Sequence, residues 1–460
     1  MAFMIAHSAI AAVHYVPQEY ATIQAAVNAS SNSDVVIVAQ GRYTGTGNRN
    51  VNMYGKQITV QSSAPNDPAV VSSTIIDCEG RNRGFVCYTG ETAGSIIRGF
   101  TITRGYAILG GAIYCYNNSS PSIANCVITG NSAVFGGAIA CANSKTYPKI
   151  SNCKITANSA SVGGGAIYCN GASPKITTCL INANFAPDGG AVYSHNTGNP
   201  VITNCSISGN AASKSAGAIY CYSSSNLKLD NDILWGNTAV NAPDLYIAGN
   251  GAATVVQLSY CDVRNDNIVY DAGCSVNWGA GNISADPRFA GMGALTLNNT
   301  FSGGDYHLVK GSPCIDAGNP AYVSEPGETD IDGKPRISGV KIDIGAYEIQ
   351  MPIPAAFEIH PETLNLGSNG RWLSGIISSV GKYGIGDIDT ALMVLNDTIK
   401  PESVAIEDGK MLLKFSRSEV EEKVGTAENE TVLSITGKLN NGKDFAGSDT
   451  IRIIRPAGKK

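Results

Sequence analysis

The sequence predicts an all-β protein in which a parallel β-helix of about 26 residues per coil is followed by a C-terminal β-sandwich. A Gly-Gly-Ala-Ile-Tyr-Cys phrase recurs through the middle of the chain, with repeats that begin at Gly110, Gly136, Gly164, Gly189 and Ala216. Each repeat holds short runs rich in Ile, Val, Thr and Tyr, separated by Gly, Pro, Asn and Ser. Such runs are typical of strands, and a period of this length indicates a solenoid.

Composition agrees with a solenoid and excludes some functions. Only 15% of the 460 residues are charged, whereas glycine is abundant with 52 residues. The net charge of −5 gives no basic excess for nucleic acid. No apolar run is long enough to span a membrane.

Three columns of equivalent residues test the alignment of the repeats. In a parallel stack, equivalent residues lie about 4.8 Å apart. The first two columns predict small buried thiols. The third predicts stacked asparagine amides, because asparagine tolerates the left-handed backbone of a sharp turn. The first column is Cys115, Cys141, Cys169, Ser194, Cys221; the second is Cys126, Cys153, Cys179, Cys205, Asn231; the third is Asn131, Asn158, Asn184, Asn210, Asn237.

Cysteines in the two columns are expected to remain free thiols. Their parallel Cβ vectors disfavour the opposed geometry of a disulfide. Among the cysteines outside the columns, Cys261 and Cys274 are the pair best placed to form a disulfide, although the sequence leaves open whether they do.

The asparagine column resembles those of the pectate-lyase-like superfamily. The Gly-Gly-Ala-Ile phrase is similar to the repeats of polymorphic outer-membrane proteins and autotransporter passengers. The stretch 244–348, with KGSPCIDAGNP and DIDGKPRISGVKIDIGAYE, looks like the ending of exported bacterial and archaeal β-helix proteins. The resemblance implies a right-handed helix, which the general rule for parallel crossovers also favours. It implies no particular activity, because such chains serve many roles.

Domain boundaries follow from the decay of these patterns. We expect a signal-peptide remnant at 1–12 and a β-helix at 13–350, with a cap helix at 20–30 that buries Ile23, Ala26 and Val27. Regular coils are expected at 95–240 and irregular C-terminal coils at 241–350. A Pro-containing linker precedes an immunoglobulin-like β-sandwich at 355–456.

Catalytic chemistry has weak support in the regular coils. If the superfamily resemblance extends to function, it implies polysaccharide cleavage, for which the lyases hold Ca²⁺ with clustered carboxylates and the hydrolases use paired carboxylates. Between Gly105 and Asp230 the only acidic residue is Asp188. The catalytic candidates therefore lie in the early coils: Asp77, Glu79, Glu91, Arg98 and Arg104. A candidate Ca²⁺ site comprises Asp330, Asp332 and Asp343, although plain turns explain these residues better.

The outer face of the coils offers a binding surface. With Ile and Cys inward, the Tyr of each repeat points out, where its ring could stack on a sugar. The residues expected to bind glycan are Tyr114, Tyr168, Tyr193, His195, Tyr220, Lys149 and Lys175. The alternatives are that Tyr merely favours strands and that the lysines keep the sheet soluble.

Two hypotheses follow. The first is a secreted or cell-surface structural or adhesive module that binds polysaccharide or a partner along the Tyr-bearing face, or associates with itself. The second is a lyase or hydrolase acting on an anionic, uronate-containing glycan.

Overall fold

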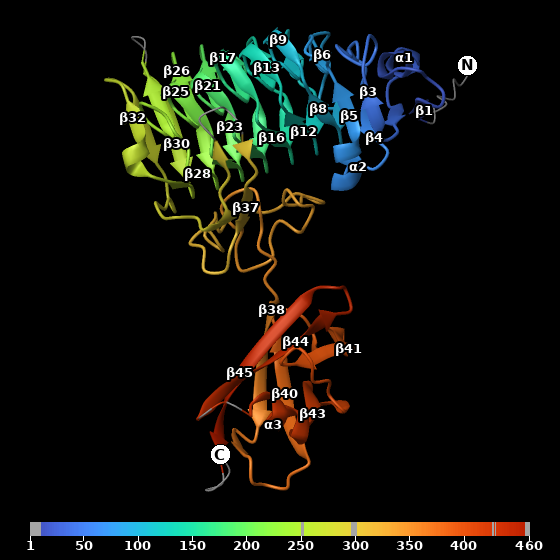
Figure 1. The fold of residues 1–460 in the computed structure, drawn as a ribbon, viewed down its shortest axis with the longest axis vertical. Helices are drawn as coiled ribbons and strands as arrows, with labels where there is room; N and C mark the ends of the chain where they lie inside the picture. Colours follow the sequence, from blue (N-terminus) through green and yellow to red (C-terminus); the bar gives the residue numbers. More distant parts are fainter. Residues whose placement is uncertain (1–10, 250–252, 296–300, 426, 428, 456–460) are drawn as a thin grey trace, which may run out of the picture. The chain divides into compact units, whose positions relative to one another are not determined.

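A computed structural model describes residues 11–249, 253–295, 301–425, 427 and 429–455. The chain divides into two compact units, one ending at Ile349 and the other beginning at Gln350. The first is a parallel β-solenoid of about ten turns, and the second is a β-rich domain (Figure 1). Among the described residues, none of the helices combines the length and apolar character needed to cross a membrane.

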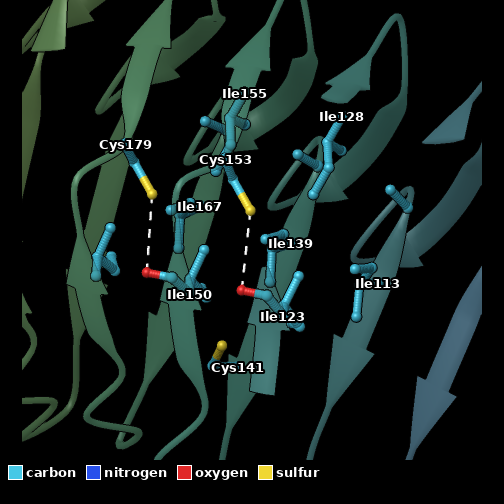
Figure 2. Close-up of a cluster of buried hydrophobic side chains, with 14 of the residues drawn as sticks. Ile113, Ile123, Ile128, Ile139, Cys141, Ile150, Cys153, Ile155, Ile167 and Cys179 are labelled. Carbon is cyan, nitrogen blue, oxygen red and sulfur yellow. Dashed lines mark hydrogen bonds between the residues drawn. The ribbon is translucent and has the colours of Figure 1, made fainter. Parts of the chain in front are cut away.

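Each regular coil contributes one strand to each of four parallel sheets, A, B, D and C in chain order. In one coil these strands are β11 (Ser122–Ala124), β12 (Val127–Thr129), β13 (Ser132–Phe135) and β14 (Ile139–Ala142). An inward Ile lies at the centre of the sheet A and sheet B strands, and coil-to-coil register places Ile123 beside Ile150 and Ile128 beside Ile155. These side chains are fully buried and form a continuous core, as Figure 2 shows.

The remaining strands repeat this arrangement. Sheet A also contains β1 (Val13–Val16), β2 (Val35–Val38), β4 (Thr59–Ser62), β7 (Ile96–Arg98), β15 (Lys149–Ser151), β19 (Lys175–Thr177), β23 (Val201–Thr203), β27 (Lys228–Asp230), β30 (Val255–Ser259) and β33 (Ser275–Trp278). Sheet B also contains β3 (Gly41–Tyr43), β5 (Thr74–Asp77), β8 (Thr101–Thr103), β16 (Lys154–Thr156), β20 (Leu180–Asn182), β24 (Ser206–Ser208), β28 (Ile233–Trp235) and β31 (Asp262–Val263). Sheet C also contains β6 (Phe85–Cys87), β10 (Ile113–Cys115), β18 (Ile167–Asn170), β22 (Val192–His195), β26 (Ile219–Tyr222), β29 (Leu245–Ala248) and β32 (Ile268–Tyr270), and sheet D also contains β9 (Tyr106–Leu109), β17 (Ser159–Gly163), β21 (Phe185–Asp188) and β25 (Ala211–Ser215).

Buried asparagines join the coils at the turn from sheet B to sheet D. Asn158 Nδ2 donates to Asn184 Oδ1 at 3.0 Å, and the same contact recurs from Asn131 to Asn237. The left-handed backbone falls on the preceding residue, such as Ala157 with φ 54° or Gly130 with φ 64°. The prediction that the ladder asparagines themselves take this conformation is therefore wrong, since their role is hydrogen bonding alone.

Left-handed asparagines do occur at the sharp corner between sheets A and B. We call this set the corner column, and it consists of Asn125, Asn152, Thr178, Asn204 and Asn231, with φ between 51° and 59°. Asn231 therefore belongs here and not to the second cysteine column, where Asp232 takes the position. The cysteine column resumes one coil later with Cys261, which, like Cys205, places its Sγ close to the carbonyl two residues before it.

All thirteen cysteines are buried free thiols, so the pairing of Cys261 with Cys274 is wrong. Cys261 is a core residue of its own column, whereas Cys274 lies in the turn before β33. Column thiols approach main-chain carbonyls of the coil before, as with Cys153 Sγ to Ile123 O at 3.8 Å (Figure 2). The inward Cβ vectors of a parallel stack explain why these thiols do not pair.

The glycine pair makes room where sheet D turns into sheet C. A Cβ on Gly137 would lie 2.3 Å from Gly165 O and 2.4 Å from Ser159 O. Gly136, its neighbour, has φ 66°, which is the left-handed region that glycine adopts without strain. The two glycines of each repeat therefore have different roles, one conformational and one steric.

The first coil is covered by helix α1 (Ile23–Ala29), which buries Ile23, Ala26 and Val27 and is capped by Thr22. A second helix, α2 (Pro68–Ser73), precedes β5. The expected leader falls almost wholly on residues 1–10, outside the described residues. Sheet D ends at β25, so the coils described from β29 to β33 place strands in sheets A, B and C alone.

The described residues of 284–349 add no strand to the four parallel sheets, and contacts such as Asn152 with Thr329 hold part of this segment against the corner column. Their elements are β34 (Phe289–Gly291), β35 (Ala294–Leu295), β36 (Phe301–Ser302) and β37 (Asp305–Leu308), which pair as two antiparallel ribbons. The 3-10 helix η1 (Asn265–Asn267) precedes β32 in the last coil. The polar motifs of 314–348 therefore form a wall that packs against the solenoid.

The second unit has its own apolar core between two sheets that share β38. Its elements are β38 (Ile353–His360), β39 (Thr363–Asn365), β40 (Trp372–Val380), η2 (Ile385–Asp387), β41 (Ile388–Leu395), β42 (Ser403–Glu407), β43 (Lys410–Ser416), α3 (Arg417–Lys423), β44 (Glu430–Leu439) and β45 (Asp444–Ile454). Alternating inward residues such as Leu413 and Phe415 build this β-sandwich.

Candidate functional site

The tyrosines of sheet C form one stacked row on the outside of the solenoid. Tyr168, Tyr193, Tyr220 and Tyr246 are in register on adjacent strands. Ring centroids are 5.7, 5.0 and 5.4 Å apart along this row. The Tyr193 and Tyr220 rings are parallel to within 4°. Rings stacked along the helix axis cover one another's faces and present mainly their edges to solvent.

Packing within this face limits what the predicted aromatic residues can contact. Tyr168 is only 6% exposed, because Phe135 of sheet D packs against its ring at 4.7 Å. Burial raises the pKa of Tyr193 to about 12, so its hydroxyl stays protonated at neutral pH. The His195 ring stacks on Tyr222 at 5.2 Å, and burial lowers its pKa. Tyr114 lies beside Tyr116 and beneath the Arg83 guanidinium.

A polar groove runs along the corner column between the solenoid and the segment 322–333. It comprises two adjoining cavities of about 470 and 410 Å³, which share Asn152, Gly327 and Glu328. We call it the corner groove. The smaller cavity is lined by Ser151, Asn152, Lys175, Thr177, Thr178, Thr203, Asn204, Tyr322, Val323, Glu325, Pro326, Gly327 and Glu328.

Hydroxyl groups repeat along one side of the corner groove. Ser151, Thr177 and Thr203 face outward from sheet A and are in register on β15, β19 and β23. In parallel strands this register spaces them about 4.8 Å apart. Lys175 lines the same cavity, whereas Lys149, its register partner, lies outside both cavities.

The wall of the groove is attached by the corner column. Asn152 Nδ2 donates to Thr329 Oγ1 at 3.1 Å, and Asn204 Nδ2 donates to the Tyr322 hydroxyl at 3.0 Å. Asn231 Oδ1 accepts the backbone N–H of Asn319 at 2.7 Å. These contacts join residues more than 80 positions apart, so the repeat pattern carried no sign of the groove. The corner asparagines were the one available signal.

A charged group closes the end of the larger cavity. Lys154 Nζ lies 3.7 Å from Asp332 Oδ1, and His307 bridges Asp332 and Asp305 through its two ring nitrogens. Desolvation lowers the pKa of His307, but hydrogen bonds to the two carboxylates outweigh it and the net pKa is raised. His307 showed no partner in the sequence because these residues are distant along the chain.

The three aspartates of the candidate Ca²⁺ site do not form a ligand cluster. Asp330 accepts the N–H groups of Asp332 and Lys334, and Asp343 accepts those of Asp316 and Ile349. Burial raises the pKa of Asp343 to about 6. Within the described ranges, no group of three or more His, Cys, Asp or Glu side chains is arranged to hold a metal ion. These carboxylates organise turns.

The early-coil candidates have structural partners. The Asp77 carboxylate is fully buried and accepts from Arg104 at 2.7 and 2.6 Å and from Arg42. Burial opposes its ionisation, yet these hydrogen bonds lower its pKa. Glu79 pairs with Arg49. The remaining contacts are Glu91 with the N–H groups of Gly55 and Thr89, and Arg98 with Gln61.

A comparison with known protein families supports the fold. Residues 137–299 match the family model described as "Right handed beta helix region", which assigns the hand of the solenoid. The crystal structure of pectate lyase Pel9A is similar to this chain with a TM-score of 0.40 and 14% identity, over 74% of this chain and 97% of that chain. A likeness at this level supports no inference about activity. No curated protein matches the chain.

Proposed function

We propose that this protein is a secreted or cell-surface module that binds an extended polysaccharide in the corner groove. The β-helix fold fits a polysaccharide-related function. The observation that carries the proposal is the row formed by Ser151, Thr177 and Thr203, which follows the groove at one hydroxyl per coil. The spacing of about 4.8 Å is comparable with the length of one sugar residue. An extended glycan can thus meet successive hydroxyls without bending.

The groove supports binding better than the Tyr-bearing face does. Sugars stack on the faces of aromatic rings, and in sheet C those faces are covered by neighbouring rings. Tyr193 and Tyr220 are partly exposed and are kept as a secondary contact. We assign the stacked row mainly a stiffening role.

The lyase or hydrolase alternative has less support. The early-coil carboxylates are engaged by arginines or main-chain N–H groups and line neither cavity. Asp332 does line the groove, but it is already bound by His307 and Lys154. A carboxylate held by two such partners is better suited to stabilising the wall of the groove than to catalysis.

Matched double variants test the proposal. Thr177→Val with Thr203→Val removes two groove hydroxyls while keeping β-branched side chains. Thr129→Val with Thr156→Val does the same on sheet B, outside the groove. Affinity electrophoresis against a polysaccharide panel should show weaker retention for the first pair alone.

Two results would overturn the proposal. The first is that the wild-type protein retains no polysaccharide. The second is that retention survives the groove pair but is lost in Tyr193→Phe with Tyr220→Phe, which would move binding to the Tyr-bearing face. Reducing-end and unsaturated-product assays on the same mixtures report any cleavage.

A further inference from the structure

Two buried polar atoms line the smaller cavity of the corner groove without a hydrogen-bond partner in the described part of the chain. They are Thr178 Oγ1 and Asn204 Oδ1, and each residue is only 1% exposed. Leaving a buried polar group unpaired costs about 1–3 kcal/mol. Such atoms in residues that line a cavity are therefore candidates for contact with a ligand.

Their neighbours in the corner column contact overlying segments, and Asn231 Nδ2 is also buried without a partner among the described residues. Asn125, Asn152 and Asn231 each hydrogen-bond an overlying segment, through Asn66, Thr329 and Asn319 respectively. Thr178 lies between the attachment points at Thr329 and Tyr322, where the wall passes over the cavity instead of contacting the column. Thr178 and Asn204 are thus the corner-column residues that both have an unpaired atom and line a cavity.

The hydrogen-bond roles at this point can be assigned. The Tyr322 hydroxyl has one proton, which it donates to Glu328 Oε1, so it accepts from Asn204 Nδ2. The Asn204 amide is therefore oriented with Nδ2 toward Tyr322, which leaves Oδ1 free to accept a hydrogen bond. A ligand must therefore donate a hydrogen bond to Asn204, which a hydroxyl does and a carboxylate cannot do. Thr178 Oγ1 donates to or accepts from a second hydroxyl.

Charge in this cavity does not favour an anion. Lys175 is accompanied by Glu325 and Glu328, which gives two carboxylates to one ammonium group. Deepening the proposed function, on which this inference rests, we infer that Thr178 and Asn204 form a subsite that hydrogen-bonds the hydroxyl groups of a neutral sugar residue. A uronate is disfavoured because its carboxylate would face the two glutamates.

The test is calorimetric titration of the full chain with neutral gluco-, manno- and xylo-oligosaccharides and with oligogalacturonate. The variant Thr178→Val keeps size and β-branching and deletes the hydroxyl, and Thr129→Val is the control. One hydrogen bond is worth about 1 kcal/mol, so affinity for the best neutral oligosaccharide should fall about fivefold to tenfold in Thr178→Val. The control should bind like the wild type.

Each outcome decides a different claim. Removal of a buried unpaired hydroxyl should leave Thr178→Val at least as stable as the wild type, so lost binding will not reflect unfolding. If oligogalacturonate binds more tightly than every neutral oligosaccharide, or if Thr178→Val binds like the wild type, the subsite is refuted while polysaccharide binding stands. If no glycan binds the wild type, the proposed function itself fails.

Discussion

Replacing Asn158 with alanine should destabilise the solenoid far more than replacing an exposed asparagine. The Asn158 side chain donates to Ile128 O at 2.9 Å, Thr156 O at 3.0 Å and Asn184 Oδ1 at 3.0 Å. It also accepts from the backbone N–H and the side chain of Asn131, both at 3.0 Å. Alanine can make none of these contacts.

The expected loss follows from the groups left behind. The buried N–H of Asn131 loses its side-chain acceptor, at a cost of about 1–3 kcal/mol. The carbonyls that lose a hydrogen-bond donor add about 1 kcal/mol to the loss, because a buried carbonyl tolerates a missing hydrogen bond better than a buried N–H does. We therefore expect a loss of about 2–4 kcal/mol, a large part of the 5–15 kcal/mol typical of a domain.

Urea unfolding followed by circular dichroism measures this loss. The control is Asn199→Ala, because Asn199 is exposed and its side chain accepts one coil-to-coil hydrogen bond, from Asn226 N–H at 2.9 Å. The control should cost less than about 1 kcal/mol. Equal midpoints and slopes for the two variants would refute the claim that the buried ladder holds the coils together.

Three other variants test separate features of the fold. Gly137→Ala should prevent or severely weaken folding, because the added Cβ would lie 2.3 Å from a main-chain oxygen. In the control Gly130→Ala the added Cβ would meet no atom closer than 3.4 Å, so urea unfolding should show a loss of only about 1–2 kcal/mol from the left-handed backbone. The change in stability caused by Asp232→Asn should be more favourable at pH 8 than at pH 4, because burial raises the pKa of Asp232 and the folded state resists its ionisation, although the amide can accept only one of the two N–H bonds, from Cys205 and Asp230, that the carboxylate accepts; an effect independent of pH would contradict this. In the wild type, proteolysis of the 325–333 wall should increase as pH rises through the raised pKa of His307. A raised histidine pKa stabilises the folded state fully below the pKa of the unfolded chain, near 6.5, and this stabilisation is lost above the pKa of the folded state. His307→Gln should remove that dependence, and a pH profile unchanged in the variant would exclude the histidine as its cause.

The core of the solenoid was predictable because its signal is periodic. Ile and Cys columns, the asparagine ladder and the glycine pair recur at nearly constant spacing, so each coil repeats the evidence of the one before. The errors arose where spacing or conformation changes by one residue. Asp232 was displaced to Asn231 in this way, and the left-handed conformation was assigned to Asn158 where it belongs to Ala157.

The candidate site was much less predictable. The tyrosines were placed correctly outside sheet C, but the sequence could not show that their rings stack on one another. The groove depends on contacts such as Asn152 with Thr329, which no local pattern encodes. Only Lys175 among the predicted glycan-binding residues lines it. A wall folded back from a distant segment must be seen in three dimensions.

The most direct test of the central claim is a crystal structure of the protein soaked with the oligosaccharide that binds best. We predict sugar residues along the corner groove, with hydroxyl groups within hydrogen-bond distance of Ser151, Thr177 and Thr203. Ordered sugar on the Tyr-bearing face with an empty corner groove would contradict the account.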